Sequence, residues 1–270
     1  MPPTPPSSSD PEAPREQITL LDGTAAEVWQ DKDGWSLQIN GIRQSHMGPP
    51  DVPPKPAAFR WILAALGSNL PERSAHLGGG LLTVPRVLAA RRPGSQHIVV
   101  ELEPELVRLA REKFGLPPEV DLRLGDARAW IDETDDPAST EPFDAIVIDV
   151  FAGGRIPPEF TSLDCFARAR SKLSPRGRLV VNSVAGPELE ITRRALAGMQ
   201  SLFEHVAMIV QGSVLKGMRS GNAILIGSAE PLDSDAIRAA LSEDSARASL
   251  VTDIDPIVGG APPIRGTEQF

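Results

Sequence analysis

The chain has 270 residues, of which 41% are hydrophobic, so it can bury a core as one large or two small domains. Its net charge of -9 argues against a nucleic-acid partner and is compatible with a cationic small molecule such as an amine. The single cysteine, Cys165, excludes an internal disulfide and fits a cytoplasmic protein. No apolar run approaches the ~20 residues of a membrane span, so we expect no membrane association. The histidine spacing predicts no metal site.

Composition divides the chain into four segments. Residues 1–16 are rich in proline and serine, which predicts a disordered leader. Residues 17–56 contain short strand-like runs separated by Asp-Gly turn signals and end in a proline-rich connector, which predicts a small antiparallel β unit. Residues 57–245 form the main domain, and residues 246–270 are expected to be an extended tail.

The main domain alternates strand and helix patterns, which is typical of a parallel sheet covered on both faces. The expected strands are 75–77, 98–101, 121–124, 145–149, 178–182, 205–210 and 222–227. The expected helices are 57–65, 82–91, 104–114, 162–173, 187–203 and 229–242. No helix separates the last two strands, so they should pair as an antiparallel ribbon. Seven strands with that ribbon favour an α/β fold of the doubly wound, Rossmann-like class, in its S-adenosylmethionine-type (class I methyltransferase) variant.

Three glycines, Gly78, Gly79 and Gly80, interrupt the first strand-to-helix connection. Only residues without a Cβ let backbone N–H groups and a helix N-terminus approach a ligand so closely. The next strand ends in Glu101, about 20 residues further on, where a nucleotide-binding βαβ unit places an acid on the ribose hydroxyls. This spacing predicts a nucleoside site.

Two more acids follow strands of the same sheet. Asp126 comes after the third strand and Asp149 after the fourth, so the carboxyl ends of neighbouring strands carry three carboxylates. An acid at the position of Asp126 can accept a hydrogen bond from an adenine amino group. The alternative for Glu101 or Asp126 taken alone is that it caps the following helix.

The chain contains the segment HLGGGLLTVPRVLAARRPGSQHIVVELEPELVRLAREKF, followed by LRLGDARAWI, FDAIVIDVFAGGRIPPEF and SGNAILIGS. Together these segments resemble the spermidine synthase-like family, the aminopropyltransferase branch of the class I methyltransferase fold. The resemblance covers roughly residues 18 to 228. It implies that the nucleoside of decarboxylated S-adenosylmethionine, or the product methylthioadenosine, contacts Gln44, Gly78, Gly79, Gly80, Glu101, Asp126 and Ala127. It also implies that Asp149 faces the reacting centre and, by analogy, that a homodimer forms.

The chain departs from the family pattern in three ways. Leu81 stands where the family has an aspartate that binds the aminopropyl ammonium group, and Ala152 stands where the family has the last acid of the motif after the fourth strand. The chain also contains no tyrosine, so the family's tyrosine contacts to the polyamine are missing. Asp149 is then the foremost candidate for the base that frees the attacking amine, with Glu159 and His46 as weaker alternatives.

Other polar residues near these motifs have simpler interpretations. His76 and His97 begin strands and are more typical of edge positions than of catalysts. Arg155 follows Asp149 in a glycine-containing loop; it could gate the pocket or bind an acidic group, although a surface position fits better.

Three functions fit the sequence. The first is aminopropyl transfer from decarboxylated S-adenosylmethionine to an amine or polyamine acceptor. The second is methyl transfer from S-adenosylmethionine, since Leu81 removes the ammonium-binding acid. The third is a non-catalytic nucleoside- or partner-binding protein, because two expected acids are absent.

Overall fold

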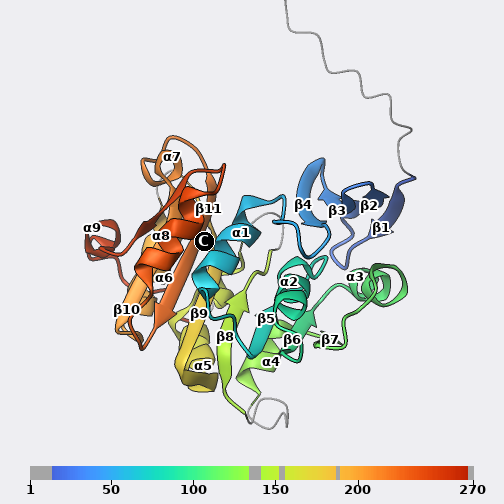
Figure 1. Cartoon of the computed structure of the whole chain (residues 1–270). Coiled ribbons are helices and arrows are strands. Elements are labelled where there is room, and N and C mark those ends of the chain that lie inside the picture. Colours follow the sequence, from blue (N-terminus) through green and yellow to red (C-terminus); the bar gives the residue numbers. More distant parts are fainter. Residues whose placement is uncertain (1–13, 134–140, 152–155, 187–188, 267–270) are drawn as a thin grey trace, which may run out of the picture.

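An eight-stranded sheet forms the centre of the molecule (Figure 1). The computed structural model describes residues 14–133, 141–151, 156–186 and 189–266. The strands lie in the order β12-β10-β11-β9-β8-β5-β6-β7. Their bounds are β5 (Arg73–Leu77), β6 (Gln96–Glu101), β7 (Val120–Leu124), β8 (Phe143–Ile148), β9 (Leu173–Ala185), β10 (His205–Gln211), β11 (Gly221–Ser228) and β12 (Ala248–Val251). The expected doubly wound fold is confirmed.

Strand pairing explains why the site forms where it does. Strands β9, β8, β5, β6 and β7 pair in parallel, so their carboxyl ends share one edge. β5 lies between β6 and β8. The chain first adds β6 and β7 on one side of β5, and then returns to add β8 and β9 on the other side. In such sheets the connections diverge at this point and leave a crevice for a ligand. β11 is antiparallel to β9 and β10, as expected for the final ribbon.

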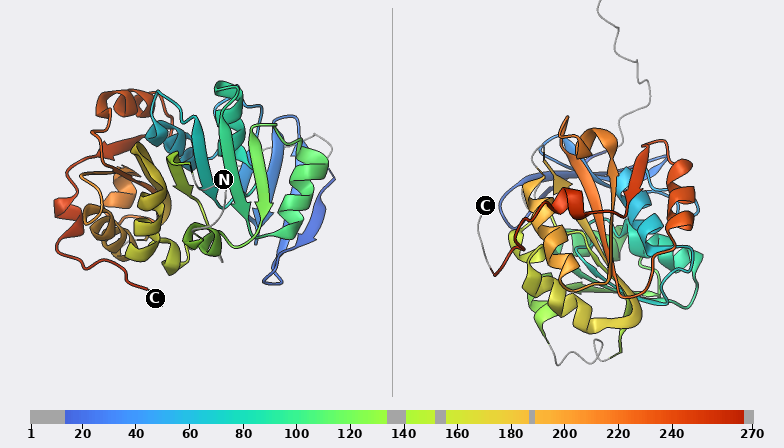
Figure 2. Two further views of the ribbon diagram at one scale, coloured as in Figure 1. Left: turned by 90° about the horizontal axis from the view of Figure 1, so that it is seen from below. Right: turned by 90° about the vertical axis from the view of Figure 1, so that its left-hand side faces the viewer.

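Helices cover both faces of the sheet (Figure 2). One face carries α1 (Ala57–Leu66), α2 (Thr83–Arg91) and α8 (Ser234–Ser242). The other carries α4 (Ala127–Asp132), α5 (Leu163–Lys172) and α6 (Glu190–Gln200). α3 (Pro104–Leu109) continues into the π-helical turn η1 (Ala110–Phe114). Burial on both faces accounts for the apolar runs of the central strands.

A four-stranded antiparallel sheet precedes the main domain, as the sequence predicts. It consists of β1 (Glu16–Thr19), β2 (Ala25–Asp31), β3 (Gly34–Ile39) and β4 (Ile42–Met47) in that order. Its inner face, which includes Val28 and Leu37, packs against Leu81 and Leu82 of the glycine connection. The small sheet therefore covers one side of that connection.

The carboxyl-terminal segment corrects two expectations. The main sheet has eight strands in the described residues rather than seven, because β12 pairs with β10. Residues 246–270, expected to be an extended tail, include β12 and the short helix α9 (Asp255–Val258). Ile264 is fully buried, and its carbonyl accepts a hydrogen bond from the Leu163 N–H at 2.8 Å. Apolar burial and backbone pairing thus hold this segment against the body.

His76 and His97 are not at edges, which corrects another prediction. Both are buried in β5 and β6, where Ser74 Oγ contacts His76 Nε2 at 2.9 Å and His97 Nδ1 at 2.8 Å. Ser95 Oγ contacts the other ring nitrogen of His97 at 2.7 Å. Burial lowers the pKa of His97 to about 4, and burial together with the neighbouring His97 lowers the pKa of His76 well below its usual value. Both rings are therefore neutral in the folded protein.

We expect this histidine cluster to make the fold acid-sensitive. The histidines of the unfolded chain take up protons below a pH of about 6.5, whereas His97 in the folded protein is protonated only near its lowered pKa of about 4. The free energy of unfolding should therefore decrease as the pH is lowered from about 6.5 to about 4, by up to about 1.4 kcal/mol per pH unit for each histidine. Urea unfolding of His97→Gln between pH 7 and 5 should show a shallower slope than wild type. Equal slopes would contradict the assignment.

Candidate functional site

The glycine connection is packed so tightly that two of its positions exclude a side chain. Gly78 has φ +90°, and a Cβ there would lie 2.4 Å from the Asp149 carbonyl oxygen. A Cβ on Gly79 would lie 2.9 Å from Val99 Cγ1. Gly80 has φ +51°, in the left-handed region that glycine adopts most readily. The glycines therefore let the chain leave β5 and turn toward α2 in the narrow space between the ends of β6 and β8.

The Glu101 carboxylate holds this connection. Its Oε2 accepts hydrogen bonds from the N–H groups of Gly79 and Gly80 at 2.8 Å each. Its Oε1 accepts one from the Glu103 N–H at 2.9 Å. A carboxylate offers about four acceptor positions, so about one remains for a ligand in this arrangement. Contact with both ribose hydroxyls would require a loop N–H group to release the carboxylate.

Asp126 and Ala127 lie at the end of the neighbouring strand. The Gly125 N–H donates to the Glu101 carbonyl at 3.0 Å, so this turn and Glu101 share one edge of the sheet. Asp126 Oδ1 caps α4 by accepting hydrogen bonds from the Arg128 and Ala129 N–H groups at 2.7 and 3.4 Å. The capping alternative is thus correct for Oδ1. Ala127 is the first residue of α4, where N–H groups have no partner within the helix.

Two exposed leucines flank the acids and were missed by the sequence analysis. Leu102 is 53% exposed and directly follows Glu101, and Leu124 is 52% exposed and pairs with Glu101 in the β6–β7 register. Ligand sites typically combine apolar surface with a small number of convergent polar groups, and these two leucines lie beside such groups. The signal in the sequence is an apolar residue directly after β6 and another at the last position of β7, next to the acids.

Asp149 lies on the other side of the glycine connection. It is partly buried, and its Oδ1 accepts a hydrogen bond from Asn182 Nδ2 at 2.7 Å. Burial raises the pKa of Asp149 to about 6, the Asn182 hydrogen bond acts against the rise, and the charge of Glu101 adds to it. Asn222 Nδ2 in turn donates to Asn182 Oδ1 at 2.9 Å. Neither asparagine belongs to a sequence motif that would have identified it.

Gln44 lies on β4, beside the glycine connection. The pairing of β3 with β4 shifts by one residue between Leu37 and Gln38, which leaves Gln44 in a β-bulge. Bulges redirect side chains and are common next to active sites. A Cβ on Gly80 would lie 3.7 Å from the hydroxyl of the adjacent Ser45. Gln44 is therefore in the right neighbourhood for a ligand at the loop.

The remaining candidates do not join this group. Leu81 is fully buried in the core shared with the small sheet, so it lines no amine pocket. His46 is buried on β4, and burial lowers its pKa. Glu159 lies on the short helix η3 (Pro158–Phe160). Burial raises the pKa of Cys165 to about 12, which fits a core residue rather than a nucleophile. Ala152 and Arg155 lie outside the described residues.

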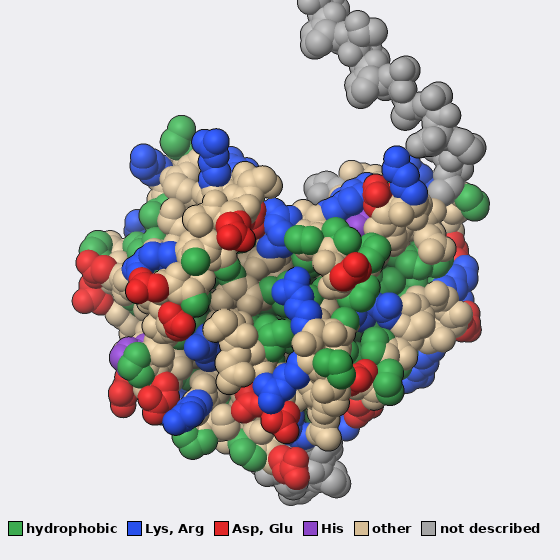
Figure 3. Space-filling view, in the orientation of Figure 1, with side chains coloured by type: hydrophobic (Ala, Val, Ile, Leu, Met, Phe, Trp, Pro, Cys, Tyr) green, Lys and Arg blue, Asp and Glu red, His purple; other side chains and the backbone are tan. Residues whose placement is uncertain are grey.

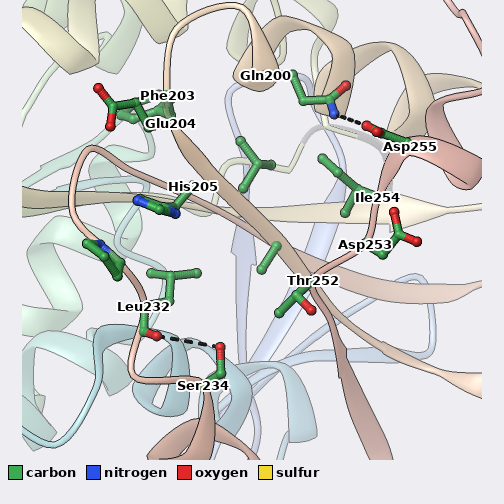
Figure 4. Close-up of a pocket in the computed structure, with 13 residues that line it drawn as sticks. Gln200, Phe203, Glu204, His205, Leu232, Ser234, Thr252, Asp253, Ile254 and Asp255 are labelled. Carbon is green, nitrogen blue, oxygen red and sulfur yellow. Dashed lines mark hydrogen bonds between the residues drawn. The ribbon is translucent and has the colours of Figure 1, made fainter.

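The surface above the carboxyl edge is hollowed between α7 (Gly212–Leu215) and the small sheet (Figure 3). A separate pocket of about 410 Å³ lies at the start of β10 and includes Phe203, His205 and Asp253 (Figure 4). β10 runs in the same direction as β9, so this pocket lies at the opposite edge of the sheet from the glycine connection. It is not part of the candidate site.

A substitution at Gly78 tests the packing of the connection. We expect Gly78→Ala to lower the free energy of unfolding by about 3 kcal/mol or more, because it combines a strained φ with a backbone clash. Gly94→Ala is the matched control, since Gly94 has φ +84° but open space around its Cβ position. That variant should lose only about 1–2 kcal/mol. Equal losses in urea unfolding would show that the contact with Asp149 is unimportant.

Comparisons with known proteins find similar structures and similar sequences. The structure of a probable spermidine synthase from Corynebacterium glutamicum ATCC 13032 is 34% identical, with a TM-score of 0.83, and the match covers 97% of this chain and all of that one. A polyamine aminopropyltransferase from Vibrio vulnificus is 32% identical over 133 residues, 48% of this chain and 44% of that one. An N-terminal histidine N-methyltransferase from Emericella nidulans is 27% identical over 127 residues, 47% of this chain and 22% of that one.

The curated relatives match this chain over part of their length. The alignments span less than half the length of the Vibrio and Emericella proteins. No family model matches the chain. In the described part of the structure, no helix is long and apolar enough to cross a membrane.

Proposed function

The chain belongs to the spermidine synthase-like family of the class I methyltransferase fold, and from this we propose that it transfers an aminopropyl group from decarboxylated S-adenosylmethionine to an amine. The observation that carries the proposal is the meeting of Glu101, the glycine connection and Asp149 at one switch point of the sheet. Asp149, with a pKa raised to about 6, lies across the glycines from Glu101, whereas Asp126 lies on the Glu101 side.

The nucleoside would lie along the ends of β5, β6 and β7. Leu102 and Leu124 offer apolar surface for the base, and Asp126 offers an acceptor for its amino group. Glu101 offers its remaining acceptor position to the ribose, while the N–H groups of Gly79 and Gly80 hold its carboxylate in place. Gln44 would approach from the small sheet. The donor's reacting carbon would then point toward Asp149, on the β8 side.

The chemistry needs a neutral amine. An amine with a pKa near 10 is uncharged in only about one part in a thousand at pH 7. Its lone pair forms a bond to the methylene carbon next to the sulfonium, while the carbon–sulfur bond breaks and its electron pair stays on sulfur. Methylthioadenosine leaves as a neutral thioether. Asp149 would take the proton that the amine releases, and its raised pKa makes it a better acceptor than an ordinary aspartate.

Methyl transfer from S-adenosylmethionine is the second candidate. It is favoured by Leu81, which is fully buried where the family places an ammonium-binding aspartate. A non-catalytic nucleoside-binding role would follow if neither donor reacts.

Product analysis distinguishes these functions. The purified chain is incubated with decarboxylated S-adenosylmethionine or with S-adenosylmethionine, each with a panel of diamines and polyamines. We expect methylthioadenosine from the first donor and no S-adenosylhomocysteine from the second. The reverse result would establish methyl transfer instead. Nucleoside binding without either product would contradict both transferase proposals.

A further inference from the structure

Three strands place a row of polar side chains behind the reacting edge. Asp149 follows β8, and the β8–β9 register, in which Ile148 faces Val181, places Asn182 beside it. Asn222 enters from β11, whose antiparallel direction brings its first residues to the edge where the parallel strands end. The hydrogen bonds run from Asn222 to Asn182 and from Asn182 to Asp149.

The direction of these bonds follows from the chemistry of the groups. An ionised carboxylate only accepts hydrogen bonds, so Asn182 must present its NH₂ group to Asp149. The Asn182 amide oxygen then faces away and needs a donor, because the residue is buried, with only 3% of its surface exposed. Asn222 Nδ2 supplies that donor. Without it, the buried Asn182 amide oxygen would lack its donor, and the orientation of the amide toward Asp149 would be less firmly fixed.

We propose that Asn222 is a positioning residue that fixes the Asn182 amide and thereby orients the Asp149 carboxylate toward the acceptor amine. This inference rests on the proposed function of Asp149 as the proton acceptor. Asn182 holds Oδ1, which leaves Oδ2 for the substrate side. Asn222 has no contact with Asp149 in the described hydrogen bonds and acts through Asn182.

The arrangement has a consequence for protonation. The Asn182 hydrogen bond lowers the pKa of Asp149, against burial and the charge of Glu101, which both raise it. Around Asp149, β6 contributes the charged Glu101, while the connection after β5 contributes the uncharged Gly78 and β9 the uncharged Asn182. Loss of the Asn222 donor should therefore raise the pKa of Asp149 further and move the acidic limb of the pH–rate profile to higher pH.

The test is a carboxyl ¹³C NMR titration of the full chain. The Asp149 resonance is identified as the one missing from Asp149→Asn. Asn222→Leu keeps the approximate shape of the side chain but removes its donor, and Asn222→Ala replaces it if leucine disrupts β11. We expect the Asp149 pKa to rise by about 0.5 to 1 unit. Asn222→Gln retains an amide donor and should keep the Asp149 pKa close to the wild-type value, and Asn69→Ala, at an exposed position, should leave that pKa unchanged.

Kinetics give the second readout. The acidic limb of kcat/KM should move by the same amount in Asn222→Leu, with KM for the nucleoside donor nearly unchanged. An unshifted Asp149 titration in the folded variant would overturn the positioning role. If wild type forms no methylthioadenosine, the proposed function fails, yet the titration still decides whether Asn222 acts on Asp149.

Discussion

Asp149→Asn is expected to lower kcat for methylthioadenosine formation by about 10³-fold, the contribution of a well-placed general base. Asparagine has nearly the same shape but cannot take the proton from the amine. Affinity for methylthioadenosine should remain nearly intact, since the proposed contacts to the base and ribose come from β4 and from the ends of β6 and β7, not from Asp149. In wild type, kcat/KM should fall as the pH drops through about 6, because Asp149 becomes protonated. Steady-state kinetics and isothermal titration measure both quantities.

The matched control for this prediction is Asp235→Asn. Asp235 lies on α8, its side chain is almost fully exposed, and its only described ion pair is with Arg238 on the same helix. Surface pairs of this kind contribute little to stability. The control should therefore retain the wild-type rate. An Asp149→Asn variant with an unimpaired rate would remove Asp149 from the mechanism.

Glu101→Gln is expected to weaken methylthioadenosine binding by about 10- to 100-fold, which corresponds to losing a charged acceptor worth about 1–3 kcal/mol. Glutamine keeps one oxygen for the N–H groups of Gly79 and Gly80, so the connection retains a partner that alanine would not supply. Isothermal titration calorimetry measures the affinity. Thermal unfolding shows separately whether the connection has been disrupted.

Glu105→Gln provides the comparison for that experiment. Glu105 lies in the first turn of α3 and pairs with Arg108 on the surface. It carries the same change of charge close to the same edge of the sheet. Its affinity for methylthioadenosine should match that of wild type. Unchanged affinity in Glu101→Gln would refute the assignment of Glu101 to the ribose.

Periodic burial explains which elements could be predicted from the sequence. The central strands read as apolar runs and the longer helices as amphipathic stretches, and both patterns follow directly from layers packed against one sheet. Short elements lack that signal: α4 spans six residues and β12 spans four. Their positions depend on tertiary contacts, such as the pairing of β12 with β10.

The candidate site was predictable where a local rule applied. Glycines followed by an acid at a fixed spacing identify the β5–β6 connection, because positive φ and close approach restrict those positions to glycine. Asn182 and Asn222 follow no such rule. They come together only through the register of β9 with β11, in which Asn222 pairs with Val184 and so lies diagonally beside Asn182, 40 residues away in the chain.

The central claim is that a purine nucleoside lies across the ends of β5, β6 and β7 with its sulfur end toward Asp149. A crystal structure of the chain with methylthioadenosine tests it most directly. We predict the ribose at Glu101, the base beside Leu102 and Leu124, and the thioether facing Asp149. A nucleoside bound elsewhere, including the pocket at the start of β10, or turned with its base toward Asp149, would contradict the claim.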